Sequence, residues 1–282
     1  MSLELDARRR AMLEEMGVRV WSPLHPDGMD DAPAGPPREE MATVAAQSSA
    51  PESIAPRAAT TRTEPRFEPQ AAAQPVAAAA SLPAGIAAMD WDALQQAVAG
   101  CTACGLCQSR KNTVFGVGDT QARWLVVGEA PGENEDLQGE PFVGQAGQLL
   151  DNMLKAVGLN RGASGTQGVF IANVLKCRPP ANRNPLPQEV ATCEPYLRRQ
   201  VALLQPQIIL ALGRFAAQSL LQATVPDVAS IPLGKLRGQV HQYDGVPVIV
   251  SYHPAYLLRT PQDKAKAWAD LCLALDVAKR AP

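Results

Sequence analysis

The chain has 282 residues, of which 46% are apolar, 5% aromatic and 19% charged, and its formal net charge is −2. This length can bury a sizeable core, no run approaches the ~20 apolar residues of a membrane span, and the charge argues against a broad basic nucleic-acid coat. The start, MSLELDARRR, lacks the apolar stretch of a secretory signal, so we expect a cytoplasmic protein.

The first 88 residues differ in composition from the rest. Residues 5–21 read as a short amphipathic helix followed by Val-Arg-Val-Trp, so we treat residues 1–21 as one amphipathic segment. Residues 22–88 form an Ala/Pro-rich linker that we expect to be disordered, because it offers too little apolar surface to offset the entropy of ordering. Residues 1–21 suit docking to a replication or repair protein, and folding back on their own domain is the equal alternative.

From residue 89 onward, predicted strands alternate with predicted helices. Residues 89–100 should form a helix with Asp90 as its N-cap and Gly100 as its stop. The predicted strands are 123–129, 168–177, 206–213, 238–245 and 246–254, and the predicted helices are 144–159, 185–205, 214–222 and 262–279. The alternation predicts a three-layer α/β/α sandwich with a mainly parallel central sheet in residues 89–282.

Polar residues follow three of these strands at the point where each strand ends. The first strand runs into Gly-Glu-Ala-Pro-Gly at 128–132, the second ends near Asn173, and the last ends at Ser-Tyr-His-Pro, 251–254. Ligands bind at the carboxyl ends of the strands in open α/β sheets. We therefore expect one binding site at this edge.

Four of the six cysteines have the spacing of a metal site. Cys101 and Cys104 form a C-x2-C pair, and Cys177 and Cys193 are spaced C-x15-C after the second strand. Four thiolates from two separated segments can hold zinc or an iron–sulfur cluster, and the spacing alone does not choose between them. Cys107 is an extra candidate ligand.

Four segments carry a resemblance to the family 4 uracil-DNA glycosylases, the iron–sulfur type of bacteria and archaea. They are CTACGLCQSRKNTVFGVGD (101–119), VVGEAPGENEDLQGEPFVGQAGQLLD (126–151), IANVLKCRPPANRNPLPQE (171–189) and SYHPAYLLR (251–259), in the order of the family. The resemblance implies a monomeric enzyme that flips uracil out of DNA, hydrolyses its N-glycosidic bond and leaves an abasic site. A related branch binds DNA covalently through a histidine in an inserted loop, but this chain runs GEPFVGQAG there, so we expect turnover.

The resemblance also implies roles for the strand-end residues. Gly128 and Ala130 would line the base pocket, and Phe142 would stack on the flipped uracil. Asn173 would pair with uracil N3–H and O4 and reject cytosine, which presents the opposite pattern. His253 would hydrogen-bond uracil O2 and support the leaving anion.

The cysteine pattern becomes specific through the same resemblance. A 4Fe–4S cluster would be held by Cys101, Cys104, Cys177 and Cys193, while Cys107 falls where the family pattern requires no ligand.

Five residues are expected to contact DNA. Arg178 and Arg183 lie on a proline-rich loop that suits phosphate contacts, and an ordinary solvated loop is the alternative. Residues 254–259 resemble the loop that enters DNA, with Tyr256 and Leu257 as apolar wedges and Arg259 on a phosphate. DNA as the substrate would place the enzyme at the bacterial nucleoid.

The sequence does not identify which carboxylate assists the attacking water. Family 1 enzymes have an Asp where this chain has Ala130, which can do no acid–base work. Glu129 resembles the family 4 glutamate, and Glu135 and Asp136 are further candidates. A catalytically silent DNA-binding or polymerase-accessory protein with the same fold is therefore the alternative function.

Overall fold

The computed structural model describes Glu15, residues 82–83 and residues 85–280. The amphipathic segment predicted at 1–21, apart from the exposed Glu15, and most of the linker predicted at 22–88 lie outside these residues. The Glu15 carboxylate lies 3.9 Å from Lys155 Nζ. Such an exposed pair contributes little free energy, so both alternatives for residues 1–21 stay predictions.

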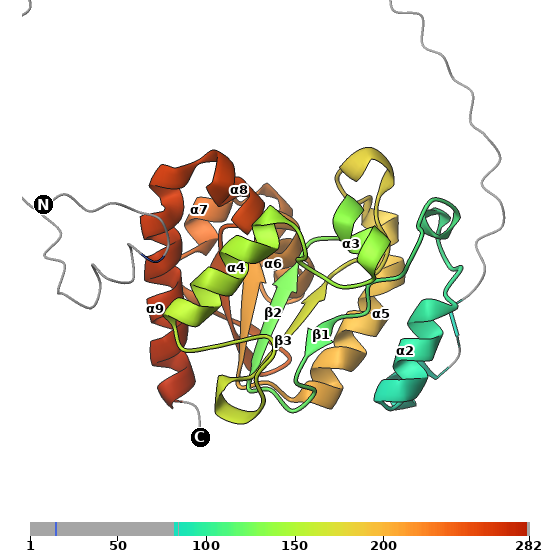
Figure 1. The fold of residues 1–282 in the computed structure, drawn as a ribbon, viewed down its shortest axis with the longest axis horizontal. Helices are drawn as coiled ribbons and strands as arrows, with labels where there is room; N and C mark the ends of the chain where they lie inside the picture. Colours follow the sequence, from blue (N-terminus) through green and yellow to red (C-terminus); the bar gives the residue numbers. More distant parts are fainter. Residues whose placement is uncertain (1–14, 16–81, 84, 281–282) are drawn as a thin grey trace, which may run out of the picture. The chain divides into compact units, whose positions relative to one another are not determined.

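The described strands form one six-stranded sheet in the order β1-β3-β2-β4-β6-β5 (Figure 1). The strands are β1 (Val117–Gly118), β2 (Trp124–Gly128), β3 (Val169–Asn173), β4 (Ile208–Leu212), β5 (Val240–Tyr243) and β6 (Val246–Ser251). The four inner strands pair in parallel, and the edge strands β1 and β5 pair antiparallel. The mainly parallel sheet is confirmed.

Helices cover both faces of the sheet, which confirms the three-layer sandwich. One face packs against α4 (Gln145–Ala156), α8 (Pro254–Arg259) and α9 (Lys264–Arg280). The other packs against α5 (Pro187–Leu204), α6 (Arg214–Leu221) and α7 (Leu233–Leu236), and Figure 1 shows α4 and α9 apart from α5. Strands buried on both faces read as continuous apolar runs, which is why β2, β3 and β4 stand out in the sequence.

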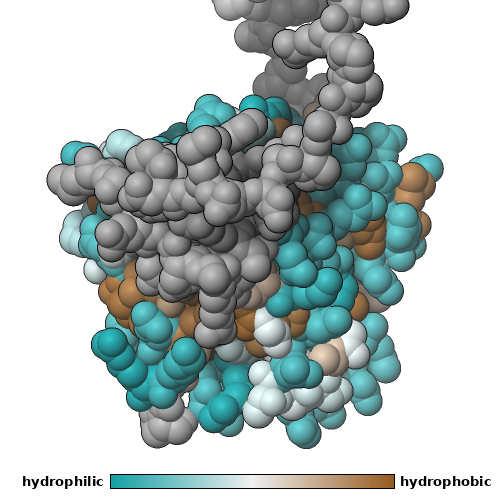
Figure 2. Space-filling model, turned by 60° about the vertical axis from the view of Figure 1, so that its left-hand side comes forward, coloured by the Kyte–Doolittle hydropathy of each residue, from teal (hydrophilic) through white to brown (hydrophobic). Residues whose placement is uncertain are grey.

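Partly buried apolar residues of helix α9 extend the core on its face of the sheet. These residues are Cys272, Leu273, Leu275, Val277 and Ala278. On the side that Figure 2 brings forward, a band of hydrophobic residues lies between hydrophilic ones. Within the described residues, no helix has the length and apolar content needed to cross a membrane.

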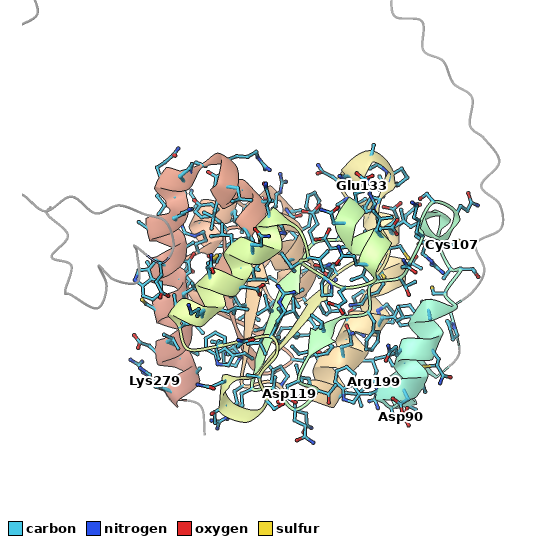
Figure 3. The ribbon with its side chains drawn as sticks, viewed as in Figure 1. Asp90, Cys107, Asp119, Glu133, Arg199 and Lys279 are labelled. Atoms are coloured by element: carbon cyan, nitrogen blue, oxygen red, sulfur yellow. The ribbon has the colours of Figure 1, made fainter. Side chains whose placement is uncertain are left out.

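A smaller cluster joins the first described segment to α5. Helix α2 (Trp91–Ala99) begins at its predicted N-cap, where Asp90 accepts a hydrogen bond from the Ala93 N–H, and ends at Gly100. Arg199 Nε donates to the Met89 carbonyl at 2.6 Å, and Figure 3 labels Arg199 and Asp90 near one end of these helices. Ile86, which is 7% exposed, also belongs to this cluster.

The second predicted strand, 168–177, is too long. Strand β3 ends at Asn173, and the next two N–H groups donate to the Gly128 and Glu129 carbonyls as the chain turns away. The prediction from the sequence also did not include β1, α3 (Glu133–Gln138), α7 and α8. The short 3-10 helices are η1 (Ile86–Ala88), η2 (Gly105–Gln108), η3 (Gly165–Gln167), η4 (Pro180–Asn182), η5 (Val228–Ser230) and η6 (Pro261–Asp263).

Candidate active site

A cavity of about 450 Å³ opens where the three predicted strand ends meet. Glu129 follows β2, Asn173 ends β3 and His253 follows β6, and all three line the cavity. Gly128 and Asn173 are register partners in neighbouring parallel strands. The residues of the predicted site that line the cavity are Glu129, Ala130, Glu135, Phe142, Asn173, Arg183, His253, Tyr256 and Arg259.

Asn173 presents an unpaired acceptor in this cavity. The residue is 2% exposed, and its Oδ1 has no hydrogen-bond partner among the residues that the structure describes. A buried amide oxygen without a partner costs free energy, so it marks a place for a donor from a ligand. Gly128 makes room beside it, because a Cβ there would lie 2.3 Å from this Oδ1 and 2.7 Å from Phe142 Cζ.

Phe142 is fixed in a conformation that costs backbone strain. Its φ of 56° lies in the left-handed region that bulky residues rarely adopt. Arg161 Nη1 holds the neighbouring Pro141 carbonyl at 3.0 Å, and α4 approaches so closely that a Cβ on Gly147 would lie 1.7 Å from the Phe142 carbonyl oxygen. The Phe142 ring stacks on His253 with centroids 5.4 Å apart. Sequence reasoning missed Arg161 and Gly147, which carry no local signal.

Glu135, which the sequence predicts to be catalytic, accepts hydrogen bonds from three backbone N–H groups. One carboxylate oxygen accepts from the Gly132 N–H at 3.1 Å, and the other accepts from the N–H groups of Val143 and Gly144 at 3.0 and 3.3 Å. Both oxygens are committed to the backbone, so Glu135 positions the loop that carries Phe142. Asp136 is likewise committed, to the Lys111 N–H at 2.9 Å.

His253 presents a neutral imidazole to the cavity. Its Nδ1 accepts a hydrogen bond from the Ala255 N–H at 3.2 Å, which leaves the proton of the neutral ring on Nε2. Burial lowers the pKa of His253 to about 4, and the positive charge of Arg259 adds to this lowering. The ring is therefore an uncharged N–H donor at neutral pH.

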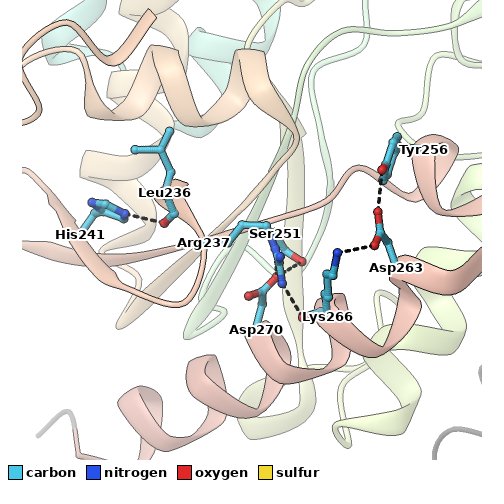
Figure 4. Close-up of polar contacts among 8 residues, drawn as sticks. All are labelled: Leu236, Arg237, His241, Ser251, Tyr256, Asp263, Lys266 and Asp270. Carbon is cyan, nitrogen blue, oxygen red and sulfur yellow. Dashed lines mark hydrogen bonds and ion pairs between the residues drawn. The ribbon is translucent and has the colours of Figure 1, made fainter. Parts of the chain in front are cut away.

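A buried network anchors the strand that leads to His253 (Figure 4). Asp270, which is 1% exposed, accepts hydrogen bonds from Ser251 Oγ and Arg237 Nε, both at 2.7 Å. The Arg237 guanidinium also lies over the Tyr252 ring, 4.3 Å from its centroid. Ser251, at the end of β6, and Arg237, just after α7, are thus both bonded to Asp270 on α9. These bonds fix the end of the strand that leads to His253.

Tyr256, a predicted DNA wedge, is held by contacts with Tyr252 and Asp263. Its ring stacks on Tyr252 with centroids 4.9 Å apart, and its hydroxyl donates to Asp263 at 2.6 Å. Asp263 also pairs with Lys266, as Figure 4 shows. Tyr256 lines the cavity but is only partly exposed and is held on its polar end.

The structure buries the other predicted wedge, Leu257. Its side chain is 0% exposed and lies in the core between α8 and the sheet, whereas Leu258 is 41% exposed. Successive residues of a helix point about 100° apart, so α8 buries one leucine and exposes the next. Leu258 is the exposed apolar residue on this helix.

Two of the predicted DNA-contacting arginines, Arg183 and Arg178, are held by neighbouring side chains. Arg183 pairs with Glu189 through both guanidinium nitrogens, at 2.9 and 2.5 Å. Arg178 Nε donates to Asn182 at 2.8 Å, and its Nη2 lies 3.5 Å from Glu133, which Figure 3 labels on α3. Arg259 is exposed at the end of α8.

The four predicted cysteine ligands lie around the first turns of α5, which carries Cys193. Cys177 and Cys193 are buried, and Cys101 and Cys104 are half-buried. Burial raises the pKa of Cys177 to about 11 and of Cys193 to about 12, and neighbouring cysteines of the set contribute to both shifts. Burial therefore favours the neutral thiols of Cys177 and Cys193, and a bound cation would be needed to hold the set as thiolates.

Hydrogen-bond donors already point at two of these sulfurs. Arg110 Nη1 donates to Cys177 Sγ at 3.2 Å, and the Lys176 N–H donates to Cys193 Sγ at 3.3 Å. Donors of this kind stabilise metal-bound thiolates. Cys107 lies in the short 3-10 helix η2, which follows α2 (Figure 3). Among the described residues, no three His, Cys, Asp or Glu side chains converge closely enough to hold a single metal ion.

Comparison with known proteins decides the family. The profile of the Uracil DNA glycosylase superfamily matches residues 115–272, more than half of the chain. The chain belongs to the uracil-DNA glycosylase superfamily. It is 44% identical to the Type-4 uracil-DNA glycosylase of Archaeoglobus fulgidus over 175 residues, which are 61% of this chain and 84% of that protein. It is 41% identical to the Type-4 uracil-DNA glycosylase of Pyrobaculum aerophilum over 189 residues, 66% and 93% of the two chains.

Membership of the uracil-DNA glycosylase superfamily confirms the resemblance drawn from the four motifs. A bacterial relative gives the same result, since the chain is 41% identical to the Type-4 uracil-DNA glycosylase of Thermotoga maritima over 59% of this chain and 82% of that protein. The roles of individual residues stay predictions.

The carboxylate beside Ala130 makes a pH-dependent contribution to stability. Burial raises the pKa of Glu129 from 4.5 to about 7. The folded chain thus holds this proton more tightly than the unfolded chain, and its stabilising effect is complete below pH 4.5 and is lost as the pH rises through 7. We expect Glu129→Gln to raise the melting temperature more at about pH 8.5 than at about pH 4.5. Thermal unfolding at both pH values checks this, and an equal change at both would contradict it.

Proposed function

We propose that this chain flips uracil out of DNA and hydrolyses its N-glycosidic bond, releasing free uracil and leaving an abasic site. The observation that carries the proposal is the buried, unpaired Oδ1 of Asn173 in a cavity that also holds the neutral His253 ring. Uracil carries an N3–H donor for the first group and an O2 acceptor for the second. Reading this base requires both groups at one wall of one pocket.

The reaction breaks the bond between the sugar C1′ and uracil N1. The bonding electrons leave with uracil as an anion, the sugar gains positive charge, and the oxygen of a water molecule adds to C1′. The His253 Nε2–H donates to uracil O2, where negative charge develops, and a pre-positioned donor in a dry site stabilises that charge strongly. Phe142 stacks on the base and Asn173 fixes its orientation.

Glu129 is the carboxylate best placed to act on water or on the cationic sugar. It lines the cavity next to Ala130, and its oxygens are free of the backbone contacts that occupy Glu135. With its pKa raised to about 7 by burial, ionised Glu129 is most abundant above neutral pH. Uracil release should therefore increase with pH through this range in the native chain.

The alternative is a catalytically silent DNA-binding or polymerase-accessory protein. Incubation with single- and double-stranded oligonucleotides containing one uracil, followed by hot alkali, separates the two. An enzyme converts the uracil site into an alkali-labile break, and a silent protein leaves the strand intact. Intact strands after stoichiometric incubation of both substrates would exclude the proposed activity.

We expect the exposed leucine of α8 to fill the space left by the flipped base. Leu258→Ala should lower uracil release from duplex DNA about tenfold or more, with little change on single strands, where no stacked neighbour has to be displaced. Leu257→Ala is the matched control and should lower the free energy of unfolding by about 2–5 kcal/mol through a core cavity. Equal activity of Leu258→Ala and the native chain on duplex DNA would refute the wedge role.

We further propose that a 4Fe–4S cluster is held by Cys101, Cys104, Cys177 and Cys193. Support comes from the two buried and two half-buried cysteines of the set and from the donors of Arg110 and Lys176 that point at two sulfurs. The bound group would neutralise the thiolates and fasten the segment after α2 to α5. The residues fit a structural role, and no step of the reaction passes through the cluster.

Removal of single cysteines tests the proposed ligand set. Cys101→Ser or Cys177→Ser should lower bound iron and acid-labile sulfide and lower the melting temperature, because a structural metal site contributes folding free energy. Cys107→Ser should keep full iron, sulfide and stability. Iron loss in Cys107→Ser, or zinc with no sulfide in the native chain, would contradict the assignment.

We also propose that residues 1–21 dock on a replication or repair protein, that the enzyme works as a monomer, and that it acts at the bacterial nucleoid in the cytoplasm. The composition of residues 22–88 supports a tether, and a DNA substrate supports the location. Because Leu82 packs against the α2 cluster, the deletion that tests the tether should stop at residue 81. That variant should retain its rate on short oligonucleotides, and a large loss would refute a pure tether.

A further inference from the structure

Lys176 is a buried lysine that the proposed chemistry does not use. Its side chain is 1% exposed, and its Nζ donates to the Asn173 carbonyl oxygen and to Gln200 Oε1, both at 2.7 Å. Burial of an ammonium group is costly unless its donors are satisfied. Both partners are neutral acceptors, so Lys176 is not half of an ion pair. It joins the Asn173 backbone to the Gln200 side chain by hydrogen bonds.

One of these two hydrogen bonds is made to Asn173, the residue proposed to bind the base. Strand β3 ends at Asn173, and the next two N–H groups donate to the carbonyls of Gly128, the last residue of β2, and Glu129. The Asn173 carbonyl is thus held by the Lys176 ammonium, three residues further along the chain. The unpaired Asn173 Oδ1 projects from the same residue, so its position depends on this hold.

The backbone of Lys176 contacts the cysteine cluster at the same time. Its N–H donates to Cys193 Sγ at 3.3 Å, and its carbonyl accepts from the Val114 N–H at 2.8 Å. Gln200 extends the connection, since its Nε2 donates to the Phe115 carbonyl at 2.9 Å. A single residue therefore joins the cysteines, the segment after α2 and the base-facing end of β3.

We propose that Lys176, supported by Gln200, is a positioning residue that sets the geometry of Asn173 for uracil, and that it transmits the anchoring of the cysteine cluster to the base pocket. The inference rests on the proposed function. A reading group must be held within about 0.5 Å of its productive place, and a displacement near 1 Å can cost about 10²-fold in rate. The end of a strand is where such a displacement is easiest.

A double-mutant cycle with Asn173 tests this role. Lys176→Met keeps the length of the side chain and removes the donors, and we expect single-turnover uracil release to fall about 10–10²-fold. In the Asn173→Ala background the same change should cost less than about threefold, because its effect passes through Asn173. Lys155→Met, an exposed lysine on α4, is the matched control and should leave the rate unchanged.

Two further readouts separate positioning from loss of structure. Iron content and melting temperature should stay near native values in the double variant Lys176→Met with Gln200→Met, which removes both partners of the buried bond and serves as the test protein if the single variant fails to fold. A native rate in the Lys176 variants, or an equal loss with and without Asn173, would overturn the proposal. An inactive native chain would instead overturn the proposed function.

Discussion

Replacement of His253 by alanine should lower the single-turnover rate of uracil release by about 10²–10³-fold. The ring supplies the N–H that meets the negative charge developing on uracil O2, and alanine leaves no donor in its place. The substitution leaves the Asp270 network intact, because Asp270 contacts Ser251 and Arg237 rather than the His253 ring. The measurement is uracil release from a single-uracil oligonucleotide with the chain in excess.

The chain offers a matched control for this experiment. His241 lies in the β5–β6 hairpin, where its ring contacts the Leu236 carbonyl at 2.8 Å, away from the cavity (Figure 4). His241→Ala should keep the native rate. Because burial holds the pKa of His253 near 4, the pH dependence of the native rate that is expected near pH 7 arises from Glu129 and not from this ring. A native rate in His253→Ala would remove the imidazole from the mechanism.

Asn173→Ala should cost a similar factor, about 10²–10³, in single-turnover release. The amide is the group at the end of β3 that can satisfy uracil N3–H, and alanine offers that donor no acceptor. The loss should appear for single- and double-stranded substrates alike, since base reading follows flipping. Parallel melting curves should stay close to native ones, because the Oδ1 has no partner to lose among the described residues.

Asn160→Ala serves as the comparison for the amide. Asn160 lies at the other end of β3, where it bridges Gly168, and it does not line the cavity. Its replacement should leave uracil release unchanged. If Asn173→Ala released uracil at the native rate, another residue would have to read the base, and the pocket assignment would fail.

The sequence predicted the sheet and the location of the site because both depend on local patterns. Continuous apolar runs identify buried parallel strands, and the polar residue that ends each run must lie at the same edge. Asn173 and His253 line one cavity for that reason. Phe142 was placed correctly in a loop, but its left-handed backbone was not foreseen, since it depends on Arg161 and Gly147 from other segments.

The structure departs from the expectations of the sequence where orientation or distant partners decide how a side chain lies. Leu257 and Leu258 are identical in chemistry, and the rotation of α8 against the core determines which of them is exposed. Glu135 looks like a catalytic acid in sequence, yet three backbone N–H groups occupy its oxygens. Asp270 lies within an amphipathic helix pattern, and only the fold brings Arg237 to it.

The count of free uracil released per chain from an excess of uracil-containing DNA tests the central claim most directly. Turnover by hydrolysis predicts several equivalents of uracil per chain, with an equal number of alkali-labile sites in the DNA. No free uracil, or at most one equivalent with the DNA retained covalently on the chain, would contradict it.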